Sequence, residues 1–162
     1  MMSRYGSLVI FLLLVVAVAV AAAGFEAGNW YFVKATRPDW SPPPWLFGPA
    51  WALAYSALAL AAWQAWLSGR GGRGGALVVW LALLASSGAW SWLVFGLHRP
   101  GWAVLELAVA LVLAGWCTAR FRRLSRQAAW LMLPFGAWIA FVWAWTLALW
   151  TLNGGPFLRF LA

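Results

Sequence analysis

The residues of this chain best suited to chemistry are aromatic rings and hydroxyls that recur at helical spacing. They are Phe47, Trp51 and Tyr55 in one apolar segment, Ser87 and Ser91 in a second, and Trp138, Val142 and Trp145 in a third. Residues about four apart lie on one face of a helix, so each group forms a stripe. Aromatic walls with a few hydroxyls suit a flat, conjugated, mostly apolar ligand. Ordinary helix packing uses the same spacing, and periodicity alone favours packing over a ligand pocket.

Conventional catalytic residues are scarce. No nucleophile, base and orienting acid occur at a recognisable spacing, and no dinucleotide, Walker or zinc motif is present. For His98, the single histidine, a solvated position at the membrane edge is favoured over a haem-ligand role. For Glu106, a structural hydrogen bond is favoured over a functional carboxylate. Cys117 is expected to be a small buried hydrophobic residue. We therefore expect no metal site and no obligatory cofactor.

The composition is that of a membrane protein. Hydrophobic residues make up 65% of the 162 residues and charged residues 9%, against about half and about a quarter in soluble domains. The net charge of +8 comes from eleven basic and three acidic residues. The basic residues lie in short breaks between apolar runs, which favours contact with lipid headgroups over nucleic-acid binding.

Apolar segments separated by charges predict an all-α bundle of five transmembrane helices in a single domain over residues 1–162. The segments run over about 5–24, 45–67, 76–97, 102–119 and 129–152. Each is close to the ~20 residues that cross a hydrocarbon core of ~30 Å. The first also resembles a secretory signal, because Arg4 precedes its apolar run and Ala21–Ala23 follow it, but a retained helix is favoured.

Basic residues in the connections predict the orientation. Those on the side of the N-terminus are Arg4, Arg70, Arg73, Arg120, Arg122, Arg123 and Arg126. Those on the opposite side are Lys34, Arg37, Arg99 and Arg159. The positive-inside rule therefore predicts a cytoplasmic N-terminus and an exterior first loop.

The tryptophans divide into two groups by their depth in the segments. Those near segment ends, expected to form an interfacial belt, are Trp30, Trp45, Trp66, Trp80, Trp102, Trp130 and Trp150. The deeper ones are Trp51, Trp90, Trp92, Trp138, Trp143 and Trp145. A buried indole N–H needs a partner, so the deeper tryptophans are expected to face the bundle or a ligand.

The long first loop, residues 25–44, is predicted to cap a site. Loops of this length without regular structure are commonly functional. Pro42–Pro44 fix φ and need no amide partner, so they suit the start of the second helix, with Ser41 as its N-cap. The same rigidity is expected to hold Trp40 and Trp45 at the mouth of the site.

These motifs occur together in one known family. The chain resembles the TspO/translocator protein family, also called tryptophan-rich sensory proteins, over nearly its whole length. The matching residues are Trp30-Tyr31, Arg37–Pro43, Phe47–Trp51 and Tyr55, then Trp90-Ser91, Phe95, His98 and Glu106, and finally Pro134, Trp138, Phe141, Leu152 and Asn153. The chain departs from the family pattern at Ser87, where asparagine is usual, at Phe135 for tyrosine, and at Val142 for alanine.

The resemblance implies a cavity between the helices, capped by the first loop, that binds porphyrins and synthetic benzodiazepine-site drugs. The expected ligand-binding residues are Trp30, Tyr31, Trp40, Phe47, Trp51, Tyr55, Ser87, Trp90, Ser91, Phe135, Trp138, Val142 and Trp145. Ser87 lacks the amide of the family's asparagine, so weaker drug binding is expected. The favoured function is a receptor that senses, sequesters or moves a porphyrin or other tetrapyrrole, haem included, in a bacterial cell membrane.

Three alternatives stay open. Some family members are reported to degrade protoporphyrin under light, and Trp51 and Trp138 match the tryptophans implicated. A transporter is a second alternative, although no buried basic residue offers an ion-coupling site. A structural partner of a membrane complex is the third, consistent with small-residue stripes such as Ala57-xxx-Ala61 and Ala110-xxx-Ala114. The family also implies a homodimer, whose interface these stripes do not locate.

Overall fold

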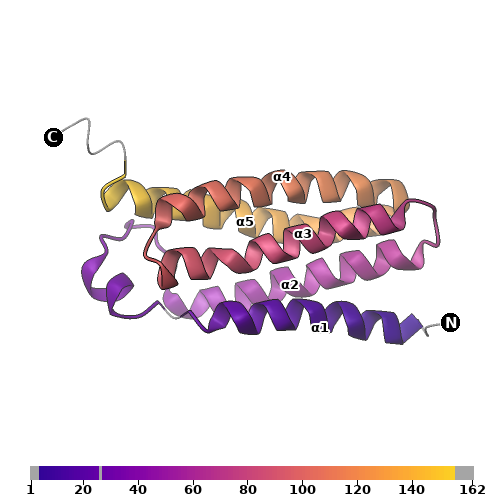
Figure 1. The fold of residues 1–162 in the computed structure, drawn as a ribbon, viewed down its shortest axis with the longest axis horizontal. Helices are drawn as coiled ribbons and strands as arrows, with labels where there is room; N and C mark the ends of the chain where they lie inside the picture. Colours follow the sequence, from indigo (N-terminus) through magenta and orange to yellow (C-terminus); the bar gives the residue numbers. More distant parts are fainter. Residues whose placement is uncertain (1–3, 26, 156–162) are drawn as a thin grey trace.

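The computed structural model describes residues 4–25 and 27–155, which form five long antiparallel helices (Figure 1). The helices are α1 (Arg4–Ala23), α2 (Pro44–Leu67), α3 (Arg73–Ser91), α4 (Pro100–Leu124) and α5 (Arg126–Leu152). Two short π-helical turns, η1 (Trp30–Lys34) and η2 (Trp92–Gly96), lie in the first loop and at the end of α3. All five helices are long and apolar enough to cross a membrane, which confirms the predicted five-helix membrane bundle.

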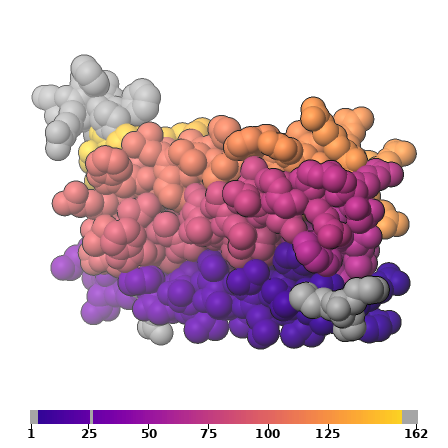
Figure 2. All heavy atoms as spheres, turned by 45° about the vertical axis from the view of Figure 1, so that its right-hand side comes forward, coloured from indigo at the N-terminus to yellow at the C-terminus, as the bar shows by residue number. Residues whose placement is uncertain are grey.

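The helices follow one another around the bundle in the order α1, α2, α5, α4, α3. The last helix, α5, packs between α2 and α4, whereas α1 lies at the edge of the molecule against α2 and α3. Figure 2 shows α1, in indigo, as an outer layer along one side. Close packing depends on buried alanines along α2, among them Ala59, Ala62 and Ala65.

The two small-residue stripes noted in the sequence are buried inside this chain. Ala57 and Ala61 keep 7% and 0% of their surface exposed, and Ala110 and Ala114 keep 0% and 5%. Because these alanines already pack within the bundle, they do not form an outward surface for a partner helix.

The fourth helix extends beyond its predicted end at residue 119, because the arginines taken as its boundary belong to its last turns. α4 continues through Arg120, Arg122 and Arg123 to Leu124. Cations near a helix C-terminus interact favourably with its dipole, so charge does not end the helix. Arg70, from the second loop, adds to this by donating from Nη1 to the carbonyl oxygens of Arg123 at 3.1 Å and Leu124 at 2.9 Å.

Two tryptophans differ from their predicted surroundings. Trp80, predicted at the interface, is fully buried and donates its indole N–H to the Leu58 carbonyl oxygen at 3.0 Å. Trp92, predicted to face the bundle, is 45% exposed. Trp92 begins the π-helical turn η2, and the wider turn changes the direction in which side chains leave the helix.

The connections with most positive charge lie at one end of the bundle. In Figure 1, the N-terminus, the α2–α3 loop and the α4–α5 connection share this end, whereas the first loop lies at the other. Arg159, used in the orientation argument, lies outside the described residues, as does Glu26. The cytoplasmic location of the N-terminus therefore stays a prediction.

Candidate functional site

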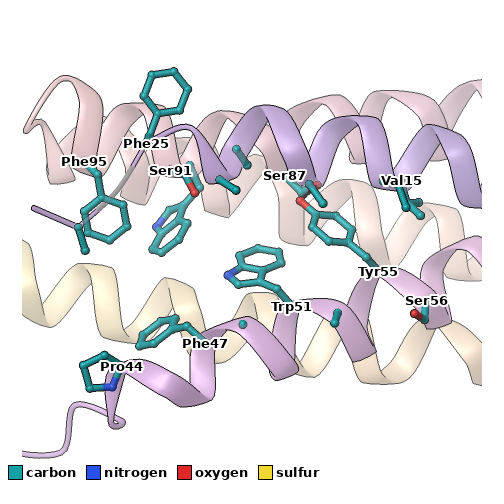
Figure 3. Close-up of a pocket in the computed structure, with 18 of the residues that line it drawn as sticks. Val15, Phe25, Pro44, Phe47, Trp51, Tyr55, Ser56, Ser87, Ser91 and Phe95 are labelled. Carbon is teal, nitrogen blue, oxygen red and sulfur yellow. Dashed lines mark hydrogen bonds between the residues drawn. The ribbon is translucent and has the colours of Figure 1, made fainter.

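A cavity of about 510 Å³ lies between α1, α2 and α3, beneath the first loop (Figure 3). From α1 it is lined by Leu12, Val15, Val16, Ala19, Ala22 and Ala23, and from the first loop by Phe25, Ala27, Tyr31 and Phe32. From α2 it is lined by Pro44, Phe47, Gly48, Trp51, Ala52, Tyr55 and Ser56. The remaining lining residues are Ser87, Trp90 and Ser91 of α3, Phe95 of η2 and Trp145 of α5. The lining is almost entirely apolar.

The aromatic wall of the cavity rises from α2, as the four-residue spacing predicts. Figure 3 shows Phe47, Trp51 and Tyr55 projecting from the same side of the helix. The rings of Trp51 and Tyr55 stack with centroids 5.1 Å apart and planes inclined by 27°. Trp90 of α3 approaches Trp51 at 5.8 Å, so the wall continues across to the next helix. Offset ring pairs of this kind stabilise one another and form a flat apolar surface.

One polar pair interrupts this wall. The Tyr55 hydroxyl lies 3.3 Å from Ser87 Oγ, and Ser87 Oγ donates to the Leu84 carbonyl oxygen at 2.9 Å. With the serine hydrogen directed at Leu84, the tyrosine hydroxyl is the donor in the pair. Both residues are buried, at 6% and 2% exposure. The pair therefore offers the lone pairs of its oxygens to a ligand, rather than free hydrogens.

Two deep indoles satisfy their N–H groups with side chains from other elements. Trp90 Nε1 donates to Thr146 Oγ1 of α5 at 2.9 Å. Trp145 Nε1 donates to Ser41 Oγ at 3.1 Å. Ser41 was predicted to be the N-cap of α2, but the capping position is Pro43, which makes no side-chain capping bond. The Ser41 hydroxyl instead ties the end of the first loop to an indole on the cavity wall.

Asn153, just beyond α5, holds the first loop over the end of the cavity. The Thr36 amide donates to Asn153 Oδ1 at 2.8 Å, and Asn153 Nδ2 donates to the Thr36 carbonyl oxygen at 2.8 Å. A further bond runs from Nδ2 to the Leu149 carbonyl oxygen at 2.7 Å. Earlier in the loop, the ring of Tyr31 packs 5.7 Å from that of Trp145. The Arg37 guanidinium lies 5.5 Å from the centre of the Tyr31 ring.

Most of the predicted ligand-binding residues lie on the lining of the cavity. These are Tyr31, Phe47, Trp51, Tyr55, Ser87, Trp90, Ser91 and Trp145. They come from four separate parts of the chain, which the fold brings together. Whether they bind a ligand stays a prediction.

Five predicted residues lie elsewhere: Trp30, Trp40, Phe135, Trp138 and Val142. Phe135 and Val142 are fully buried, because α5 turns this face to the interior of the bundle rather than to the cavity. Trp138 lies behind the aromatic wall, edge-on to Trp51 at 6.0 Å. Its N–H has no hydrogen-bond partner within the described part of the chain.

The other two predicted residues that do not line the cavity are in the first loop. Trp40 is 52% exposed and meets Phe141 edge-on at 6.0 Å, so it covers α5 rather than the cavity. Trp30 packs against the His98 ring at 5.0 Å.

Sequence reasoning missed the contribution of α1. This helix supplies six lining residues, whereas the predicted cavity used the second, third and fifth helices. The first segment is so uniformly apolar that its sequence shows no distinct inner face. The available signal was the small residues Ala19, Ala22 and Ala23, because small side chains leave space beside a helix. Two of these belong to the run that resembles a signal-peptide cleavage site.

Neither Glu106 nor His98 lies on the lining of the cavity. Ser86 Oγ donates to Glu106 Oε1 at 2.6 Å across the seam between α3 and α4, in agreement with the favoured structural role. Glu106 Oε2 has no partner among residues 4–25 and 27–155. His98 is exposed and adopts a positive φ of 52° in the short link before α4. Within the described residues, no three His, Cys, Asp or Glu side chains form a group that could hold a metal ion.

Comparison with known proteins gives consistent matches along the chain. The sequence pattern of the TspO/MBR family matches residues 8–151. The translocator protein of Homo sapiens is 32% identical over 133 residues, which are 80% of this chain and 78% of that protein. The tryptophan-rich protein TspO of Archaeoglobus fulgidus is 32% identical over 149 residues, covering 90% and 96% of the two chains. The protein CrtK of Rhodobacter capsulatus is 29% identical over 154 residues, covering 92% and 96%.

Proposed function

We propose that this chain, which belongs to the TspO/MBR family, is a membrane receptor for a flat, mostly apolar molecule of the porphyrin type. The observation that carries the proposal is the apolar cavity with its continuous aromatic wall. Pockets that bury small ligands are typically hydrophobic and contain a few placed polar groups. The Tyr55–Ser87 pair supplies such groups here.

The chemistry of the lining supports a ligand that places an apolar ring system in the cavity and leaves any charged substituent outside it. No residue on the lining carries a charge, so a fully ionised ligand would lose its hydration without a counter-charge. The stacked rings of Trp51 and Tyr55 offer a flat face for a conjugated ring system.

A titration with protoporphyrin tests the proposal. Binding in the cavity should quench tryptophan fluorescence, and Trp51→Ala should weaken binding by about 2 kcal/mol through the loss of a stacking surface. The matched control is Trp116→Ala, because Trp116 is 50% exposed on α4 and does not line the cavity. Equal affinities in the two variants would count against the cavity as the binding site.

Light-dependent breakdown of the bound porphyrin is the second candidate function. It is favoured by the position of Trp51 on the cavity wall with Trp138 directly behind it, 6.0 Å away. An illuminated porphyrin with oxygen could oxidise the indole beside it or its own ring. Illumination should then yield a defined product, and Trp51→Phe should abolish this product while leaving much of the binding. Equal bleaching in detergent without protein would dispose of this candidate.

A further inference from the structure

The cavity reaches the surface of the bundle along the seam between α1 and α2. Gly48, Ala52 and Ser56 recur every four residues on α2, and each of them both lines the cavity and is exposed. On α1, the lining residues Leu12 and Val16 are 36% and 52% exposed. Residues that face the cavity and the outside together border an opening. We call this opening, bordered by these five residues, the portal.

The depth of the portal decides what lies outside it. α2 has 24 residues, which span about 36 Å at ~1.5 Å per residue. On the same scale, Ala52 and Ser56 lie about 12 Å and about 18 Å from the Pro44 end of the helix. A hydrocarbon core about 30 Å thick therefore surrounds the portal with acyl chains rather than with water.

The seam between α1 and α2 is fastened near the far end of the helices. There, Trp63 Nε1 donates to the Arg4 carbonyl oxygen at 3.1 Å, and the Arg4 guanidinium lies 5.5 Å from the centre of the Trp63 ring. The portal lies in the other half of the seam, where the side chains on α2 are small. Small side chains facing an edge helix leave space that larger ones would fill.

The lining of the cavity has the chemistry of a hydrocarbon site. It carries no charged side chain, and its buried Tyr55 and Ser87 hydroxyls bond to each other. A hydrocarbon chain between these apolar walls makes dispersion contacts on every side, so it is stabilised there. Entry costs little hydration, because the acyl chain comes from hydrocarbon and the lining is almost entirely apolar.

We propose that the portal admits one acyl chain of a membrane lipid into the cavity, and that the receptor's ligand enters sideways from the bilayer by the same route. The second part rests on the proposed function, whereas the first part stands without it. A ligand that arrives dissolved in the bilayer then displaces the acyl chain from the cavity. The ligand class is therefore restricted to molecules that partition into hydrocarbon.

Photo-cross-linking in a bilayer tests whether an acyl chain enters. The full chain is placed in discs of phosphatidylcholine with a diazirine at the middle of the acyl chain, illuminated, and mapped by mass spectrometry. We expect label at Val15 and Tyr55, which line the cavity at 3% and 6% exposure, because a chain that stays outside contacts little of them. Label at exposed Leu53 alone would overturn the proposal.

Variants at the portal give the matched comparison. Ala52→Trp places an indole in the opening and should abolish the label at Val15 and Tyr55. Leu53→Trp is the control, because the adjacent Leu53 is 68% exposed and does not line the cavity. Ser56→Trp provides a second block if Ala52→Trp fails to fold, as judged by thermal unfolding. Label retained in a folded, blocked variant would also overturn the proposal.

A kinetic measurement separates the two parts of the proposal. Protoporphyrin preloaded in the vesicles should quench the tryptophan fluorescence of the parent protein and of Leu53→Trp quickly. It should quench that of Ala52→Trp slowly. Label at Tyr55 without any quenching of the parent would contradict the proposed function and leave the acyl-chain site supported. Quenching at equal rates in the parent and Ala52→Trp would refute the lateral route for the ligand.

Discussion

At the scale of single residues, Ser87 is the departure noted in the sequence that bears on the polar chemistry of the cavity. Its hydroxyl donates to Leu84 and accepts from Tyr55, so no side-chain hydrogen remains for a ligand carbonyl. Asparagine at this position would carry two amide hydrogens. We therefore expect the cavity to prefer ligands that donate hydrogen bonds.

Ser87→Asn is expected to strengthen the binding of a carbonyl-bearing benzodiazepine-site drug. One new hydrogen bond of about 1.4 kcal/mol would raise the affinity about tenfold. The measurement is a competition titration against protoporphyrin. An analogue of the drug in which a methylene replaces the carbonyl is the control and should show no gain. An equal gain for both compounds would mean that the asparagine acts by shape alone.

Ser86 and Glu106 allow a second prediction at this scale, on stability. Ser86→Ala removes the hydroxyl that donates to the carboxyl at 2.6 Å, and leaves a partly buried acid without this partner. We expect a loss of about 1–3 kcal/mol in the free energy of unfolding. Glu106→Gln keeps an acceptor for Ser86 and should cost much less. Thermal unfolding in detergent checks both, and the reverse order would contradict the assigned role of the bond.

At the scale of elements, the first loop is attached to the end of α5 by Asn153, and we expect loosening of this attachment to open a second exit toward water beside the portal. Asn153→Ala removes both bonds to Thr36. Two net hydrogen bonds are worth about 1–2 kcal/mol, so we expect bound protoporphyrin to dissociate about tenfold faster. The loop should also become more sensitive to limited proteolysis.

Thr151→Ala is the matched control for this loop variant. Thr151 lies on the last turn of α5, and its hydroxyl bonds to the Ala148 carbonyl oxygen within the same helix. Removal of this hydroxyl should leave the dissociation rate of protoporphyrin unchanged. If the two variants released protoporphyrin equally fast, a general loosening of the helix end would explain the effect, and the loop would not be the barrier.

The sequence predicts the helices and the α2 wall because both depend on local periodicity. The stripe Phe47, Trp51 and Tyr55 needs only the helical repeat. The location of Trp138 could not be predicted in this way, because it depends on how α5 is rotated against α2. The contribution of α1 was missed because a uniformly apolar helix in a membrane shows no polar face from which to infer its packing, and only its small residues gave a signal.

At the scale of the whole molecule, the distribution of charge predicts an orientation that thiol labelling can check. Gly71→Cys lies in the exposed second loop and Asp39→Cys in the exposed first loop. The single native thiol, Cys117, is fully buried and should not react. In intact cells, a membrane-impermeant maleimide should label Asp39→Cys and spare Gly71→Cys until the cells are opened. The opposite pattern would reverse the predicted topology.

The order of helices around the bundle has a consequence for biosynthesis. A ribosome delivers α1 first and α5 last, yet α5 occupies the place between α2 and α4. The four earlier helices therefore cannot close upon themselves as they enter the membrane, because the final one must still insert among them. Completion of the bundle waits for the end of translation, and a chain truncated before α5 should leave α2 and α4 as unpaired faces in lipid.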